Sequence, residues 1–164
     1  MPKSTSCEGA EFPNECRTAE QAAPFVAKAL IPFSNEEKAA LLALMGFESV
    51  DFRYKHNVFP GVEGQGTANM MMPKFVTEYA SDLFGDDEIS GKSLSQILAM
   101  VTLDDYNFGS AGWFLVKHCD HSVRDVLKTG TDAGWNAYMS CVGVNGSDQG
   151  RMAYWIRAKQ AFGF

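Results

Sequence analysis

The sequence predicts a mainly helical domain of the α+β class, in which one small β-hairpin interrupts the helices. Two observations predict the helices. Hydroxyl residues stand three positions before Gln, Glu or Asp at several places, which is the spacing of a capped helix start, and apolar residues then recur at intervals of three and four. The third observation is the group of glycines between Asp51 and Met72, which excludes a helix there and leaves room for the hairpin.

Four pairs of residues have the spacing of a capped helix start. In chain order they are Thr18 with Gln21, Ser34 with Glu37, Ser93 with Gln96, and Ser122 with Asp125. Pro24 complicates the first of these pairs, since proline is typical of a first helical turn. Apolar residues repeat with helical spacing after Ser34 and again after Pro73. Further helices are expected over 93–101, 106–117, 122–128, 132–140 and 148–162, which Gly, Asp or Ser residues separate.

The composition favours one domain over residues 1–164, in which residues 1–17 form a polar N-terminal arm. A chain of 164 residues with 46% hydrophobic content can build a single core. The net charge of −6 disfavours nucleic acid as a partner, because phosphate binding depends on Lys and Arg. No apolar run is long enough to cross a membrane. We therefore expect a monomer that needs neither a nucleic acid nor a membrane.

The four cysteines form one close pair near each end of the chain. Three connectivities are possible, and short loops favour Cys7 with Cys16 and Cys119 with Cys141. Four reduced, buried thiols are the alternative, as in an intracellular protein. Paired cysteines predict a secreted protein and make residues 1–17 a disulfide-held arm. No metal or other cofactor is expected, because the adjacent residues 118–121 cannot all point at one ion.

Glu48 is the residue whose position asks for an explanation. It follows Leu41, Leu44 and Met45 at spacings of seven, four and three, which places it on the apolar stripe of its helix. A buried carboxyl group without a partner stays protonated, and a protonated carboxyl group can serve as a general acid. The alternative is a glutamate that turns outward or pairs with a nearby cation such as Arg53. Asp51 is either a second carboxylate of the same site or a surface charge at the helix end.

A small, polar, glycine-rich segment follows Glu48 and is of the kind that lets a substrate lie close to the backbone. It contains Gly64, Gln65, Gly66, Thr67 and Asn69. The interpretation as a cleft wall competes with that of an ordinary hairpin. Glu63, in the same segment, is an alternative second carboxylate.

The order of several short motifs resembles the lysozyme superfamily, in particular the lytic transglycosylases and goose-type lysozymes. Its motifs here are Glu48-Ser49, then Met72-Pro73 before an amphipathic helix, the helix pattern of Asn107, Ala111, Phe114 and Leu115, and Trp135-Asn136-Ala137. The similarity covers roughly residues 34–140. The segment from Phe52 to Met70 is also similar to a group of small secreted fungal proteins, which supports secretion and disulfides.

The resemblance implies a glycan-cleaving enzyme with Glu48 as the catalytic acid and an oligosaccharide or polysaccharide as the substrate. The side chains expected to line its cleft are Tyr54, Asn57, Gln65, Thr67, Asn69, Asn107 and Trp135. The family's glutamine in the methionine-rich strand has no clear counterpart, and Tyr138 replaces the glycine of the last motif. These departures and the acidic charge favour a neutral or amino-sugar polymer over bacterial cell walls. A non-catalytic secreted module that binds a glycan or a protein on the same fold is the alternative.

Overall fold

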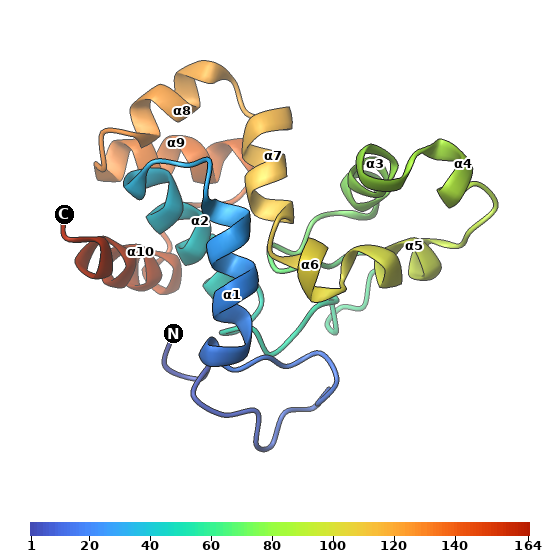
Figure 1. The fold of residues 1–164 in the computed structure, drawn as a ribbon. Coiled ribbons are helices and arrows are strands. Elements are labelled where there is room, and N and C mark those ends of the chain that lie inside the picture. Colours follow the sequence, from blue (N-terminus) through green and yellow to red (C-terminus); the bar gives the residue numbers. More distant parts are fainter.

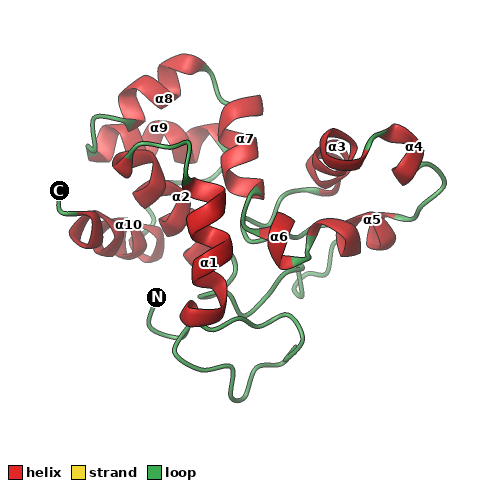
Figure 2. Cartoon of the chain, viewed as in Figure 1, coloured by secondary structure: helices red, strands yellow, loops and turns green.

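The computed structural model describes all residues from 1 to 164 and consists of helices joined by loops, with no strand (Figure 2). The helices are α1 (Ala19–Leu30), α2 (Asn35–Glu48), α3 (Pro73–Phe84), α4 (Asp86–Ile89), α5 (Leu94–Val101), α6 (Asp104–Asn107), α7 (Ser110–His118), α8 (His121–Leu127), α9 (Asp132–Cys141) and α10 (Gln149–Phe162). The mainly helical prediction is therefore confirmed, and the α+β class is wrong.

Local capping explains why most helix starts could be predicted. Thr18, Ser34 and Ser93 each accept a hydrogen bond from the backbone amide three residues on, and the side chain of that residue accepts one in return. The Ser122 start is wrong, because α8 begins at His121 after Asp120. The expected helix over 106–117 is divided into α6 and α7, and the single turn of α4 was not predicted.

Helix α2 lies in the middle of the helical body and explains where the core is. Apolar side chains on most of its sides are buried, among them Leu41, Leu44 and Met45, which is typical of a helix surrounded by others. It packs against α10, α7 and α8. In Figure 1, α3, α4, α5 and α6 form a second group beside this body. The buried apolar residues of both groups belong to one core cluster.

The predicted hairpin between Asp51 and Met72 is absent. Only two isolated backbone bridges form there, His56 with Gly66 and Gly66 with Met71. Positive φ angles at Gly64, Thr67 and Met70 turn the chain too often for an extended strand. Gly66 serves a different purpose, since a Cβ atom there would overlap the carbonyl oxygen of Lys55. The glycines thus allow tight turns and close backbone contact, not a sheet.

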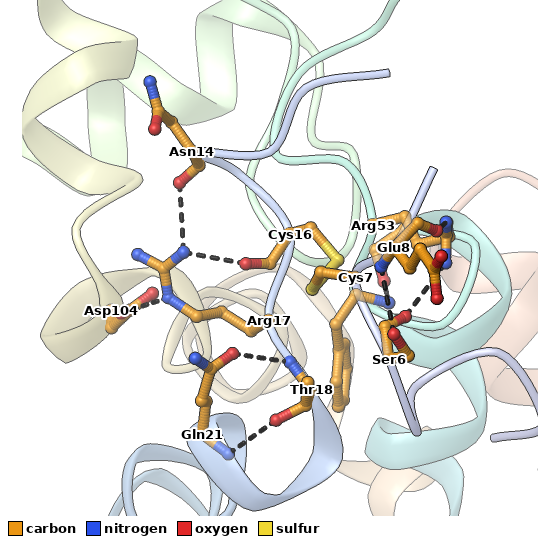
Figure 3. The surroundings of a disulfide bond; sticks show 12 residues. Ser6, Cys7, Glu8, Asn14, Cys16, Arg17, Thr18, Gln21, Arg53 and Asp104 are labelled. Carbon is orange, nitrogen blue, oxygen red and sulfur yellow. Dashed lines mark hydrogen bonds and ion pairs between the residues drawn. A yellow bond between two sulfur atoms is a disulfide. The ribbon is translucent and has the colours of Figure 1, made fainter. Parts of the chain in front are cut away.

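Both expected disulfides are present. Cys7 is bonded to Cys16 in the N-terminal arm, and Cys119 at the end of α7 is bonded to Cys141 at the end of α9. None of the helices combines the length and the apolar character that a membrane-spanning segment needs. Figure 3 shows that the first disulfide lies among polar contacts: Arg53 donates hydrogen bonds to the backbone of Ser6 and Glu8.

Candidate functional site

Two of the cavities on the molecule are similar in size and differ in the residues that line them. One is an apolar groove of about 660 Å³, and the other is a polar cleft of about 580 Å³. Both volumes are in the range of small-molecule sites, which is about 300–1,000 Å³. They have no lining residue in common.

The apolar groove has walls from α1 and α10 and receives further residues from α2 and the N-terminal arm. In Figure 1, α1 and α10 lie on either side of α2. Thirteen of its seventeen lining residues are hydrophobic, and many are alanines. The lining residues are Met1, Ser4, Thr5, Ala19, Ala23, Val26, Ala27, Leu30, Lys38, Leu42, Ala43, Phe52, Tyr154, Arg157, Ala158, Ala161 and Phe162. The short alanine side chains leave the space between the helices open.

The sequence places these alanines on one face of each wall. Ala19, Ala23 and Ala27 are four residues apart in α1, so they form one row along that helix. Ala158 and Ala161 are three apart in α10 and lie in the same way. Longer apolar residues at these positions would fill the groove.

A strained turn after α2 supplies one residue of the groove wall. Val50, Asp51 and Phe52 have consecutive φ angles of 52°, 61° and 68°, although none of them is glycine. Such backbone costs of order 1–3 kcal/mol per residue and is found mostly where function requires it. Ser49 stabilises the turn, because its hydroxyl group donates to the carbonyl of Met45 and accepts from the amide of Phe52. The turn brings the Phe52 ring to the groove.

Two cations, Lys38 and Arg157, are the charged residues of the groove, and no carboxylate lines it. Neither side chain forms an ion pair within the chain, whereas most of the other Lys and Arg residues do. The Arg157 guanidinium stacks over the Tyr154 ring at 4.5 Å, which restricts its position. Burial, together with a hydrogen bond to Asp51, raises the pKa of Tyr154 to about 12, so its hydroxyl group is protonated at neutral pH.

The polar cleft lies between the arm, the glycine-rich segment and α5. Its lining includes Phe12 and Glu15 from the arm, His56, and Ser95 from α5. Glu15 joins the arm to the cleft floor, because its carboxylate contacts His56 Nδ1 at 2.6 Å and accepts a hydrogen bond from the Lys55 amide at 2.7 Å. Across the cleft, the Ser95 hydroxyl group donates to Glu63.

An ion cluster centred on Asp104 is connected to this cleft through Lys55, which lines it. The two Asp104 oxygens each lie 2.6 Å from a cation, one from Arg17 Nε and the other from Lys55 Nζ. Burial acts to raise the pKa of Asp104, but the hydrogen bonds and charges of Lys55 and Arg17 outweigh it and hold that pKa below its usual value. Burial lowers the pKa of Lys55, and Asp104 opposes this effect. Figure 3 shows the Arg17 guanidinium between Asp104 and the backbone carbonyls of Asn14 and Cys16, to which it also donates hydrogen bonds.

The structure places Glu48 away from both cavities. Its carboxylate accepts a hydrogen bond from Arg151 Nη1 at 2.6 Å in a mostly buried ion pair, and the Arg151 guanidinium also stacks on Phe47. Asp51 is buried as well, and it accepts a hydrogen bond from the backbone amide of Lys3. Neither acidic residue lines either of these two cavities, so the two are not brought together in one of them.

The other predicted site residues fall into separate places. Asn57 and Gln65 are hydrogen-bonded to each other and line the polar cleft. Tyr54 lies at the arm, where its hydroxyl group contacts Glu11. Trp135 is fully buried and stacks on Trp155.

Thr67, Asn69 and Asn107 gather in the interior. The Asn69 side-chain oxygen accepts hydrogen bonds from the hydroxyl groups of Thr67 and Ser110, and Ser110 also donates to the Asn107 carbonyl. All four residues are buried. They form an internal polar cluster and do not line either cavity.

Sequence reasoning missed the apolar groove. Its lining comes from segments at both ends of the chain, and no local motif connects Lys38 with Arg157. The available indication was the row of alanines in α1, because a helix face made of small residues often faces another surface or a space.

Comparison with known proteins gives one partial match. A protein of Fusarium oxysporum (strain Fo5176), described as a bifunctional dioxygenase (DOX)-epoxy alcohol synthase (EAS), is 45% identical over 157 residues. The match covers 87% of this chain but 12% of that protein, so the chain spans about one eighth of the length of this relative. No protein-family model matches the chain, and no solved structure matches it.

These findings correct the functional prediction. The resemblance to the lysozyme superfamily is wrong, because the relative is a fungal dioxygenase-epoxy alcohol synthase, no lysozyme-like family model or structure matches, and the hairpin is absent. The prediction of glycan cleavage with Glu48 as the acid depended on this resemblance and is therefore wrong too. The same applies to the alternative, a glycan- or protein-binding module on that fold. Short motifs in the right order misled the prediction, since each occurs readily in unrelated helices.

Proposed function

We propose that this chain is a binding module for a small, weakly polar organic molecule, which it holds in the groove between α1, α2 and α10. The observation that carries the proposal is a cavity of about 660 Å³ with thirteen hydrophobic lining residues. Each methylene group buried there would contribute about 0.8 kcal/mol to binding. The strained turn at Phe52 adds support, because such backbone is seldom kept without a use.

The relative's name is compatible with this role. It describes an enzyme that introduces oxygen and forms an epoxy alcohol, and both activities need an organic substrate. The chain matches one eighth of that protein, so we assign it the role of an accessory binding module and not the oxygenase chemistry. The two disulfides support secretion, since oxidising compartments preserve them.

The test is a titration with N-phenyl-1-naphthylamine, an uncharged dye that fluoresces in apolar sites. We expect saturable binding to the wild-type chain. Ala27→Trp should weaken binding at least tenfold, because an indole at this exposed position on the α1 wall would occupy the groove. Ala133→Trp is the matched control, since Ala133 is an exposed helical alanine in α9, outside the groove.

Two results would contradict the proposal. One is the absence of saturable dye binding to a folded wild-type chain. The other is equal affinity for Ala27→Trp and Ala133→Trp, which would place the dye elsewhere. Ala161→Trp, on the α10 wall, repeats the test in case the α1 variant does not fold.

A further inference from the structure

The charges around the apolar groove differ from those of the whole chain. The chain has 20 acidic and 14 basic residues, which gives a net charge of −6. The groove nevertheless contains two cations and no carboxylate. A random sample of this surface would contain more acidic than basic side chains, so the groove is a local reversal of the overall charge.

The two cations are also available to a ligand. The side chains of Lys38 and Arg157 form no ion pair with an acidic residue of the chain. Arg157 is exposed and Lys38 is partly exposed. They come from α2 and α10, two helices that pack against each other, and both line the groove. The Arg157 guanidinium can donate two parallel hydrogen bonds to one anionic group.

Titratable neighbours do not cancel these charges. Tyr154, in the same wall, remains an uncharged hydroxyl group at neutral pH. Asp51 is adjacent to Tyr154, but its carboxylate is buried, receives the Lys3 amide and does not line the groove. No carboxylate among the lining residues neutralises the two cations, so an anion would find two cations without an ion-pair partner there.

We propose that the natural ligand of the groove is an amphipathic anion, in which a hydrocarbon tail lies between α1 and α10 and a carboxylate or phosphate head group contacts Lys38 and Arg157. This inference rests on the proposed function, since the tail uses the same apolar walls. It adds that the ligand is negatively charged and that its head group is oriented toward Lys38 and Arg157. An uncharged or cationic amphiphile of the same length would lose these contacts.

The experiment compares head groups on one tail. In a competition titration, the wild-type chain with bound N-phenyl-1-naphthylamine receives one of four competitors below its micelle concentration. The competitors are dodecanoate, dodecyl phosphate, 1-dodecanol and dodecyltrimethylammonium. We expect the anions to displace the dye at concentrations at least tenfold lower than the alcohol, and the ammonium to be the weakest. Whichever of the two anions is stronger identifies the head group. Added salt should reduce this preference, since it screens exposed charges.

A double variant assigns the preference to the two cations. In Lys38→Gln/Arg157→Gln, the affinity for the anions should fall about tenfold more than the affinity for 1-dodecanol does, because only the anions lose the charged contacts. The control is Lys74→Gln/Lys92→Gln, which changes the net charge equally by removing two cations that also lack ion pairs and lie outside the groove. This control should bind the anions as the wild type does.

The outcomes separate the two proposals. Suppose that Ala27→Trp abolishes dye binding and that the anions and the alcohol displace the dye equally well. This result overturns the inference about charge and leaves the groove as a binding site. An anion preference that survives in Lys38→Gln/Arg157→Gln also overturns it. Absence of dye binding overturns the proposed function itself.

Discussion

The apolar groove and the polar cleft show two ways of keeping a cavity open in one small chain. The groove is formed by helices whose other faces are apolar and buried. Its walls remain apart because many of the side chains that line it are alanines. The cleft has loops for walls and depends on a disulfide, on Glu15 and on the Asp104 cluster. The difference predicts that packing variants act on the groove side, whereas loss of the Cys7–Cys16 bond and a change of pH at Asp104 act on the cleft side.

The largest effect should come from the packing that carries the groove. Leu41 is fully buried in α2, and Leu41→Ala should reduce the free energy of unfolding by about 3–4 kcal/mol through lost burial and a residual cavity. Urea unfolding at pH 7 measures this. Leu41→Met is the control and should cost less than about 1.5 kcal/mol, because it preserves volume. A loss below about 1 kcal/mol for the alanine variant would contradict a closely packed environment of Leu41 in this core.

A smaller effect is expected from the disulfide beside the cleft. Cys7 and Cys16 are separated by nine positions, and closing a loop of that size is worth about 2–3 kcal/mol in the chain-entropy model. Cys7→Ser/Cys16→Ser should lose that amount, as measured by thermal and urea unfolding. Limited proteolysis should then cut first within residues 7–16. If first cleavage occurred in α1 or α10 instead, the contrast between the two regions would not hold.

The smallest of the three effects concerns pH. Since the folded-state pKa of Asp104 is held below 3.8, its ion pairs stabilise the fold fully above that pH, and this contribution disappears as the pH falls through the lower folded value. Asp104→Asn should therefore cost about 1–2 kcal/mol at pH 7, less than a fully buried pair would, and almost nothing well below pH 3. Unfolding curves at several pH values measure this difference.

Asp105→Asn provides the control for the pH experiment. Asp105 is the next residue, and its contact with Lys28 is long and exposed, so the variant should differ from wild type by less than about 0.5 kcal/mol at any pH. A difference for Asp104→Asn that stayed constant down to pH 2 would contradict an electrostatic origin.

The parts of the structure that could be predicted are those with local causes. Thr18, Ser34 and Ser93 cap their helices with partners three residues away, and both disulfides close short loops. Features that depend on distant partners could not be predicted in this way. Glu48 pairs with Arg151, which lies 103 residues later, so its own helix gave no indication of that cation.

The site was harder to predict than the fold. The apolar stripe of α2 correctly predicted that Glu48 is mostly buried, but a buried acid is as compatible with an ion pair as with catalysis. The glycines at 64 and 66 correctly excluded a helix and wrongly indicated a hairpin, because the close approach of Gly66 to Lys55 is a tertiary contact. The groove needs residues from α1, α2 and α10 together.

The N-terminal arm has a consequence for both cavities. Met1, Ser4 and Thr5 belong to the groove, and Phe12 and Glu15 belong to the cleft, within one segment of 15 residues. The two cavities therefore share one segment of chain as part of their walls. If occupation of the cleft altered groove affinity by some factor, thermodynamic reciprocity would require occupation of the groove to alter cleft affinity by the same factor.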